Sequence, residues 1–344
     1  MGGRTSITIK EIARELGVSK STVSRALHDS SEISQETKDR VMALVQQREY
    51  SPNPMAVSLL KSRSNSIGVL VPEIANPFFA SVISGIEEVA YRQGYYVAIY
   101  QSHEDQDREI INVRHAYNRR LDGLIVSMSA ATRSTEHFTQ LHQRGFRLVF
   151  FDRVCEDLDV PKVVVDDFDG AYRATQHLIE QGCRRIAHIG GPDQLAIARK
   201  RLYGYRAALS DYSLPIREEY EEKCSFRTEE AIRLTDRLLS LPEPPDGIFA
   251  ASDRIALGAH YALRQQGLKI PHDVALIGFT DAVIAPLLDP PLSSIAQPAH
   301  EMGQSAAELL ISQIENPEAS TVLSGTRILR TNLIPRASSV RKIE

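Results

Sequence analysis

The feature that most constrains the fold is a regular alternation of apolar runs and amphipathic segments that begins at Ser66. The apolar runs predict buried strands, and the segments between them, such as Pro77–Gln93, carry apolar residues at helical spacing. The predicted strands are Ile67–Pro72, Tyr96–Tyr100, Leu124–Met128, Leu148–Phe151, Ile186–Ile189, Gly247–Ala251 and Ala275–Phe279. The alternation predicts an α/β protein with two doubly wound parallel-sheet lobes and ligand contacts at the carboxyl ends of the strands.

The first fifty residues have a different pattern, which predicts three short helices. A capping box that begins at Thr8 opens an amphipathic helix, and Gly17 suits the left-handed end of that helix. Ser19 suits the start of a second helix that we expect to run to about His28, and a third begins near Ser34. Two short helices joined by a tight turn that contains glycine predict a helix-turn-helix head.

The second predicted helix carries polar side chains on its outer face. In a helix-turn-helix, this helix enters the major groove of DNA. Arg25 can pair with guanine, Lys20 offers a positive charge, and the hydroxyl groups can reach phosphates or bases. The candidate contacts are Lys20, Ser21, Thr22, Ser24 and Arg25. The alternative is a three-helix bundle with a solvated polar face.

A proline-containing break, Tyr50–Pro54, follows the third predicted helix and precedes a short helical segment, Met55–Lys61. A helix of this length is marginal unless it packs against a partner. It would expose Met55, Leu59 and Leu60, and apolar side chains beside a DNA-binding head can wedge between base pairs from the minor groove. The alternative is a plain linker.

Charge and composition limit the partners of the chain. The net charge is −4, but residues 1–64 carry a net +3 and the remainder a net −7, so we expect only the head to meet a polyanion. No apolar run approaches the roughly 20 residues of a membrane span, and no apolar segment typical of a secretory signal opens the chain. The three cysteines are widely spaced. We therefore expect a cytoplasmic protein with no membrane partner, disulfide framework or metal site.

These motifs resemble the LacI/GalR family of bacterial regulators over essentially the whole chain. The matching segments are Thr8–Ala13, Gly17–Ser19, Thr22–Arg25, Tyr50–Pro54, Ser58–Leu59, Ile67–Pro72, Asn76–Phe79, Asp122–Ile125 and Arg184–Gly190. The resemblance implies a homodimeric, ligand-responsive transcriptional regulator, usually a repressor, that binds double-stranded operator DNA. It also implies two lobes like those of a periplasmic sugar-binding protein, with a small-molecule effector, expected to be a carbohydrate, between them.

The resemblance assigns further roles and boundaries. Lys20, Ser21 and Arg25 match base-reading positions, and Leu59, with Ala56 and Ser58 beside it, matches the minor-groove contact. The expected domains are a head at 1–51, a hinge at 52–64 and a core at 65–344 for effector binding and dimerisation. Within the core, we expect the N-terminal lobe at about 65–164 and 293–325, and the C-terminal lobe at about 165–292 and 326–340.

Candidate effector contacts follow the predicted strands. Carboxylates, arginine forks and aromatic faces in one place are typical of a sugar or nucleobase pocket. The candidates are Phe78, Phe79, Asp152, Arg153, Arg199, Arg201, Phe226, Ser252, Asp253 and Thr280. Phe78 has a second interpretation as a core residue, and Asp253 and Asp281 have one as helix caps.

Four positions depart from the family pattern. Val57 and Leu60 stand in the hinge where the family often has basic or polar residues, which predicts fewer phosphate contacts. Ser252 and Thr280 stand where it often has Asn and Asp. The second pair suggests a different effector, such as one with an anionic group near Arg201. A phosphorylated carrier protein that docks on the N-terminal lobe is an alternative co-effector.

Other function classes lack their motifs. The chain has no phosphate-binding P-loop, no nucleophile elbow and no zinc-protease motif, so we expect no enzyme activity and no cofactor. The acidic run Asp166–Asp169 precedes a predicted helix, which it is expected to cap. A solute-binding transport protein fits the body but not the head. Apolar stripes on Pro77–Gln93 and near Met302–Ile314 suit either a dimer face or the core.

Overall fold

The computed structural model describes residues 7–27, 29–48, 50, 63–316 and 325–341. The chain divides into two compact units, 1–64 and 65–344. The predicted hinge helix, with the expected DNA contacts Ala56, Ser58 and Leu59, lies outside the described residues. Among the described helices, none combines the length and the apolar character that a membrane span requires.

The head unit consists of α1 (Ile9–Leu16), α2 (Lys20–Leu27) and α3 (Gln35–Gln47). The predicted capping box is present, because Thr8 accepts from the Glu11 amide and Glu11 accepts from the Thr8 amide. Gly17 ends α1 with a φ of 68°, as expected. The small core contains Ile12, Ala13, Val23, Ala26, Val41 and Leu44. A helix-turn-helix is therefore formed as predicted.

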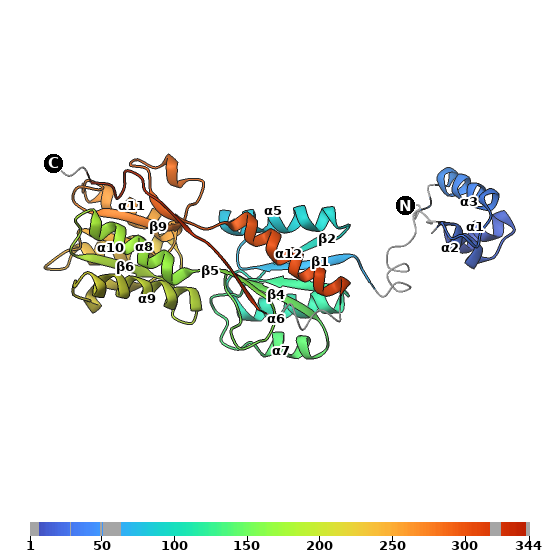
Figure 1. The fold of residues 1–344 in the computed structure, drawn as a ribbon, viewed down its shortest axis with the longest axis horizontal. Coiled ribbons are helices and arrows are strands. Elements are labelled where there is room, and N and C mark those ends of the chain that lie inside the picture. Colours follow the sequence, from blue (N-terminus) through green and yellow to red (C-terminus); the bar gives the residue numbers. More distant parts are fainter. Residues whose placement is uncertain (1–6, 28, 49, 51–62, 317–324, 342–344) are drawn as a thin grey trace, which may run out of the picture. The chain divides into compact units, whose positions relative to one another are not determined.

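The N-terminal lobe contains a parallel sheet with strand order β11-β5-β4-β3-β1-β2. The strands are β1 (Ser66–Val71), β2 (Tyr96–Gln101), β3 (Gly123–Val126), β4 (Arg147–Phe151), β5 (Lys162–Val165) and β11 (Thr326–Leu329). The helices are α5 (Pro77–Arg92), α6 (Gln106–Asn118), α7 (Glu136–Gln143) and α12 (Ala299–Glu315). In Figure 1, α5 and α12 cover one face of the sheet and α6 and α7 the other.

The C-terminal lobe contains a second sheet with strand order β12-β10-β9-β8-β6-β7, in which only β12 runs antiparallel among the paired strands. Its strands are β6 (Ile186–Gly190), β7 (Glu221–Lys223), β8 (Gly247–Ala250), β9 (Ala275–Thr280), β10 (Ser293–Ala296) and β12 (Asn332–Ile334). Its helices are α8 (Asp167–Glu180), α9 (Ala196–Asp211), α10 (Thr228–Leu239) and α11 (Asp253–Gln265). The predicted strands of both lobes are present with ends shifted by one or two residues, whereas β5, β7, β10, β11 and β12 were not predicted.

The chain passes between the lobes three times: after β5, after β10, and between β11 and β12. Two expected lobe boundaries are wrong. β10 was expected in the N-terminal lobe but pairs with β9 of the C-terminal lobe, and β11 was expected in the C-terminal lobe but pairs with β5. Both are four-residue strands whose lobe is set by pairing with distant segments, so local pattern could not assign them.

The apolar stripes on α5 and α12 belong to the core. Val82, Ile86, Met302 and Leu310 are fully buried between the two helices and the sheet. The helices cross closely at Gly85, where a Cβ atom would lie 2.1 Å from the His300 carbonyl oxygen. These stripes are therefore not available as a dimer face, one of the two interpretations left open by the pattern.

Candidate functional site

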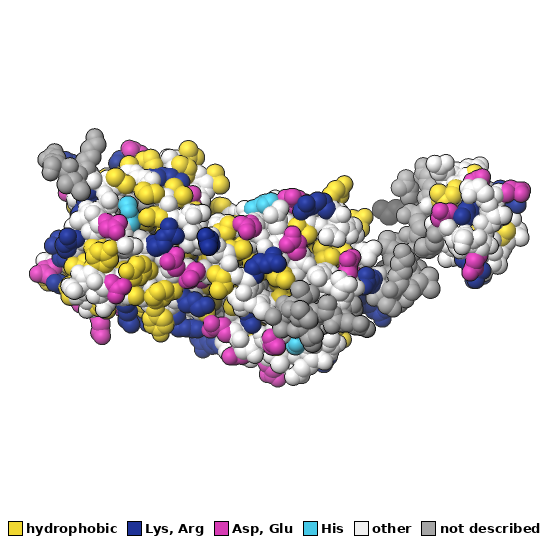
Figure 2. Space-filling model, in the orientation of Figure 1, with side chains coloured by type: hydrophobic (Ala, Val, Ile, Leu, Met, Phe, Trp, Pro, Cys, Tyr) yellow, Lys and Arg dark blue, Asp and Glu magenta, His cyan; other side chains and the backbone are white. Residues whose placement is uncertain are grey.

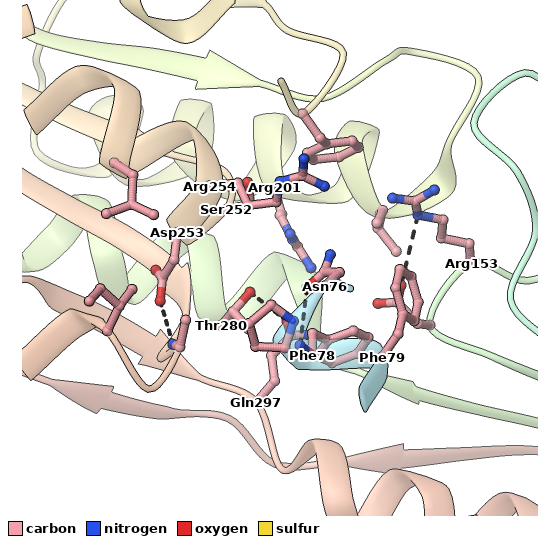
Figure 3. A pocket seen from close by; sticks show the side chains of 17 residues that line it. Asn76, Phe78, Phe79, Arg153, Arg201, Ser252, Asp253, Arg254, Thr280 and Gln297 are labelled. Carbon is pink, nitrogen blue, oxygen red and sulfur yellow. Dashed lines mark hydrogen bonds and ion pairs between the residues drawn. The ribbon is translucent and has the colours of Figure 1, made fainter. Parts of the chain in front are cut away.

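A cavity of about 110 Å³ lies between the two lobes at the carboxyl ends of their strands (Figure 3). The N-terminal lobe contributes the start of α5 and the residues after β4, whereas the C-terminal lobe contributes α9, the start of α11 and the segments after β9 and β10. The lining residues are Asn76, Pro77, Phe78, Phe79, Asp152, Arg153, Ile197, Arg201, Phe226, Ser252, Asp253, Arg254, Leu257, Thr280, Ala282, Ile284 and Gln297.

Nine of the ten candidate effector residues line this cavity, and Arg199 does not. Arg199 is exposed and bonds to Glu156 and to the Asp193 and Gln194 carbonyl oxygens. Its placement in the pocket was wrong because residues two apart on a helix face opposite sides, so Arg201 points inward and Arg199 outward. The spacing of Ile197 and Arg201 on α9 could have identified Ile197. Gln297 had no such signal, because it follows the unpredicted strand β10.

Asp152 and Arg153 form the charged part of the N-terminal wall. Both are more than nine-tenths buried, and Arg153 Nε lies 3.9 Å from Asp152 Oδ2. Burial raises the pKa of the Asp152 carboxyl, and the positive charges of Arg153 and Arg201 oppose that shift. Arg153 Nε is buried without a hydrogen-bond partner among the described residues. This N–H group and the adjacent carboxylate can bind a ligand that both donates and accepts hydrogen bonds.

Aromatic rings surround the Arg153 guanidinium. It lies 5.7 Å from the centre of the Phe79 ring in the N-terminal lobe and 5.2 Å from that of Phe226 in the C-terminal lobe. Phe78 is 7% exposed and packs edge-on against Phe79, so it serves both the core and the cavity wall. The cavity therefore combines aromatic surface with a few buried polar groups, as small-molecule sites do.

Arg201, on the C-terminal wall, is already paired within its own lobe. Its Nε and Nη2 atoms lie 2.8 and 2.7 Å from Asp167 Oδ1, and Nη1 donates to the Ala251 carbonyl oxygen at 2.5 Å. The guanidinium also lies 3.8 Å from the centre of the Phe279 ring. Burial raises the pKa of Asp167 to about 6 despite the attraction of Arg201. Because its charge is matched by Asp167, Arg201 gives no support to the suggested anionic effector.

Asp253 anchors a loop of the C-terminal lobe. Its Oδ1 accepts from the Ser294 hydroxyl at 2.7 Å, and Oδ2 accepts from the Ala282 amide at 2.6 Å. The residue that caps α11 is Ser252, and Asp281 pairs with Arg336 at 2.6 Å, so neither aspartate is the helix cap considered above. The Thr280 hydroxyl donates to Gln297 Oε1 at 3.2 Å.

The outer face of α2 presents the polar groups expected to contact DNA. Lys20, Ser21 and Arg25 are exposed, and Thr22 and Ser24 are half-buried. The Ser19 hydroxyl accepts from the Thr22 amide at 3.0 Å, so Ser19 caps α2 as predicted. Arg25 Nη1 lies 3.2 Å from Glu32 Oε2, and both side chains are exposed.

The acidic run Asp166–Asp169 begins at the N-cap of α8 and extends into its first turn. Asp166 accepts from the Asp169 amide at 2.9 Å, which confirms the expected cap. Within the part of the chain that the structure describes, no three His, Cys, Asp or Glu side chains are grouped so that they could hold a metal ion. All three cysteines are buried thiols.

Comparison with known proteins identifies the two units. Residues 8–53 match the family model of bacterial regulatory proteins of the lacI family. Residues 64–334 match the model of periplasmic binding proteins and the sugar binding domain of the LacI family. The two models cover the head and nearly all of the two-lobed body.

Relatives match over most of their length. The HTH-type transcriptional repressor CytR of Escherichia coli (strain K12) is 34% identical, with 97% of each chain covered. The ribose operon repressor of Haemophilus influenzae is 33% identical, covering 95% of this chain and 98% of that protein. A solved transcriptional regulator CelR–cellobiose complex superposes with a TM-score of 0.73 at 28% identity, covering 96% of this chain and 99% of that one. These relatives are transcriptional regulators and not enzymes. The chain therefore belongs to the LacI family, as a DNA-binding transcriptional repressor with an effector-binding domain.

Proposed function

We propose that the chain acts in the cytoplasm as a homodimer on a near-palindromic operator, and that a small carbohydrate in the cavity between the lobes controls its affinity for DNA. The observation that carries this proposal is the cavity itself. It is enclosed by both lobes, so a ligand that fits it interacts differently with open and closed arrangements. A ligand with such a difference shifts the balance between the two arrangements.

DNA recognition is assigned to the outer face of α2. Lys20, Ser21 and Arg25 are the proposed base-reading residues, and the hydroxyl groups of Thr22 and Ser24 are proposed to reach phosphates or bases. The exposure of Lys20, Ser21 and Arg25 supports this role. In the hinge, Ala56, Ser58 and Leu59 are proposed to contact the minor groove, on the family resemblance alone.

A dimer is proposed because operator half-sites are read by paired heads. The exposed apolar residues of the body supply surface for pairing. Tyr96 and Ile99 lie on the edge strand β2, and Val283 and Leu287 lie after β9. On the face shown in Figure 2, hydrophobic side chains also gather over the upper part of the C-terminal lobe.

A carbohydrate effector is proposed from the chemistry of the wall. Asp152 and Arg153 offer an acceptor and a donor side by side, and Phe78, Phe79 and Phe226 offer apolar faces. Hydroxyl groups both donate and accept, and the ring faces of sugars pack on aromatic side chains. One matched protein is a ribose operon repressor, and another was solved as a complex with cellobiose.

The DNA-binding assignment is tested by selecting bound sequences from a random pool with the full chain. We expect a near-palindrome with two half-sites. Replacement of Arg25 (Arg25→Ala) should weaken specific binding by about 1–3 kcal/mol while leaving binding to random DNA nearly unchanged. Equal losses on both DNAs would contradict the base-reading role.

The effector assignment is tested by thermal unfolding of the full chain with sugars, sugar phosphates and nucleobases. A ligand present at 100 times its dissociation constant stabilises the protein by about 2.7 kcal/mol. We expect stabilisation by a neutral sugar, and its loss in Arg153→Met. No response to any member of the panel would favour the protein co-effector.

A further inference from the structure

Glu104 contacts two groups that lie in different parts of the cleft between the N-terminal and C-terminal lobes. One of its carboxylate oxygens lies 2.8 Å and the other 2.9 Å from Arg153 Nη1, in the effector cavity. Oε2 also accepts from the Ala130 amide at 2.6 Å. Arg153 follows β4 and Ala130 follows β3, so a single carboxylate ties together the ends of two strands. Glu104 itself does not line the cavity.

The contact with Arg153 keeps the cavity wall in a form that can bind a ligand. With Nη1 held by Glu104, Nε has no hydrogen-bond partner among the described residues, and 3.9 Å separate it from Asp152 Oδ2. Without Glu104, Asp152 is the nearest carboxylate to this buried guanidinium. The two would then pair directly, because a buried cation without a partner is costly. The Arg153 guanidinium and the Asp152 carboxylate would then bind each other, and neither would be available to a ligand.

The contact with Ala130 reaches the opposite lobe. The Ala130 carbonyl oxygen accepts from Gln194 Nε2 at 2.6 Å, and Gln194 lies between β6 and α9 of the C-terminal lobe. Two ion pairs also cross the cleft: Arg199 with Glu156 at 3.0 Å, and Arg254 with Glu73. Of these three side-chain bridges, only the Gln194 bridge ends on a residue whose backbone amide Glu104 also holds.

The backbone at Glu104 adds a second observation. His103 and Glu104 follow β2 with φ values of 55° and 57°, in the left-handed region that side-chain-bearing residues rarely adopt. Two such residues in succession cost free energy, which must be offset by the contacts that they make possible. The contacts that Glu104 makes from this conformation are those to Arg153 and Ala130.

We propose that Glu104 is a positioning residue that couples the effector cavity to closure of the two lobes. It holds Arg153 away from Asp152, and through the Ala130 amide it fixes the residue whose carbonyl oxygen accepts from Gln194. The inference rests on the proposed effector function of the cavity. A ligand that binds Arg153 thereby acts on a contact across the cleft that it does not touch.

The experiment measures lobe closure in the full-length chain with neither DNA nor effector, so its outcome is separate from that of the proposed function. Dyes on cysteines at exposed sites in each lobe, Gln140→Cys and Gln265→Cys, report the distance by energy transfer. The native cysteines are buried, and excess unlabelled chain isolates the signal of single copies. Arg153→Met, Gln194→Ala and the double variant are compared with and without Glu104→Gln.

With Glu104 present, we expect Arg153→Met or Gln194→Ala alone to lower the closed-to-open ratio about tenfold. The double variant should lower it no further, because the effects of substitutions within one network are not additive. Glu104→Gln alone should reproduce the loss, and in its presence the other two variants should change little. The matched control is the Arg254–Glu73 ion pair. The effects of Arg254→Met and Glu73→Gln on the closed-to-open ratio should be non-additive whether or not Glu104 is replaced.

Three results would overturn the proposal. The first is that Arg153→Met and Gln194→Ala have multiplicative effects on the closed-to-open ratio with Glu104 present, and the second is that these two variants remain coupled to each other in Glu104→Gln. The third is that energy transfer is equal in all variants. Circular dichroism verifies that each variant is folded. If Glu104→Gln does not fold, Glu104→Asp keeps the charge but is one methylene too short to reach both partners, and it should also remove the coupling.

Discussion

The two walls of the cavity contain similar residue types but differ in how those residues are paired. On the N-terminal wall, Arg153 has a buried N–H group without a partner among the described residues. On the C-terminal wall, Arg201 is matched by Asp167 and the Ala251 carbonyl, and Asp253 by Ser294 and Ala282. A charged residue at the end of a strand can therefore serve either a ligand or its own lobe.

This comparison separates residues whose loss should impair ligand binding from residues whose loss should impair folding. The N-terminal wall is expected to carry the first kind and the C-terminal wall the second. Measuring binding and stability on the same variants therefore tests the assignment of each wall.

The largest effect is expected at Arg201. Arg201→Met leaves Asp167 buried and without its charge partner, which should lower the free energy of unfolding by about 3–5 kcal/mol. Adding Asp167→Asn should recover much of the lost stability, because the double variant has no buried carboxylate without a partner. Urea unfolding of the full chain measures both. A stable Arg201→Met variant that fails only in ligand binding would show that this wall serves the ligand.

A pH effect of similar size is expected at Asp253. Burial raises its pKa from 3.8 to about 6, so the folded chain retains the proton that the unfolded chain releases as the pH rises above 4. Stability should therefore fall by about 3 kcal/mol between pH 4 and pH 6 through this residue. In Asp253→Asn, this part of the fall in unfolding free energy with rising pH should be absent. The same pH dependence of the unfolding free energy in both proteins would contradict the shifted pKa of Asp253.

Arg153→Met should have the opposite profile to Arg201→Met. Effector binding should weaken by about 2 kcal/mol, because the variant removes a buried, charged hydrogen-bond donor. Stability should fall less than in Arg201→Met, because Glu104 is 35% exposed and can be hydrated when Arg153 is gone. Asp152 makes no close hydrogen bond to Arg153, from which it is 3.9 Å away, and it retains the attraction of Arg201. Calorimetric titration and urea unfolding give the two values. A stability loss as large as that of Arg201→Met would remove the distinction between the walls.

The smallest effect is expected in the head, where the Arg25–Glu32 pair is exposed on both sides. Glu32→Ala should change stability by less than about 0.5 kcal/mol, as exposed pairs contribute little. It should also strengthen operator binding slightly, because Arg25 no longer has to leave Glu32. Fluorescence anisotropy with operator DNA measures this, and weaker binding would indicate that Glu32 orients Arg25 for its base.

The sequence predicts the elements whose signals are local. The capping box at Thr8, the left-handed Gly17 and the start of α2 at Ser19 each depend on residues within one turn, and each is present. The long strands β1 and β9 are equally clear, because their apolar runs are buried on both faces. The short strands β10 and β11 escape prediction because partners more than ten residues away decide their pairing.

The candidate site shows the same limit. Asp152, Arg153 and Arg201 were found because strand ends converge in this type of fold and because they match family positions. The sequence could not show that Arg201 is neutralised by Asp167, whereas Arg153 keeps an N–H group without a hydrogen-bond partner in the described part of the chain. That difference depends on α8 and α9 packing together, which places Asp167 beside a residue 34 positions away. Glu104 was missed for the same reason, since its partners come from two other strand ends.

The most direct test of the account is the effect of the effector on operator affinity. Operator DNA from the selection is titrated with the full chain, with and without a saturating amount of the sugar that stabilises it most. We predict a change in affinity of about 5–150-fold, with the operator changing the affinity for the sugar by the same factor. Arg153→Met should abolish this response to the sugar. An operator affinity that stays the same when the cavity is occupied would contradict the account.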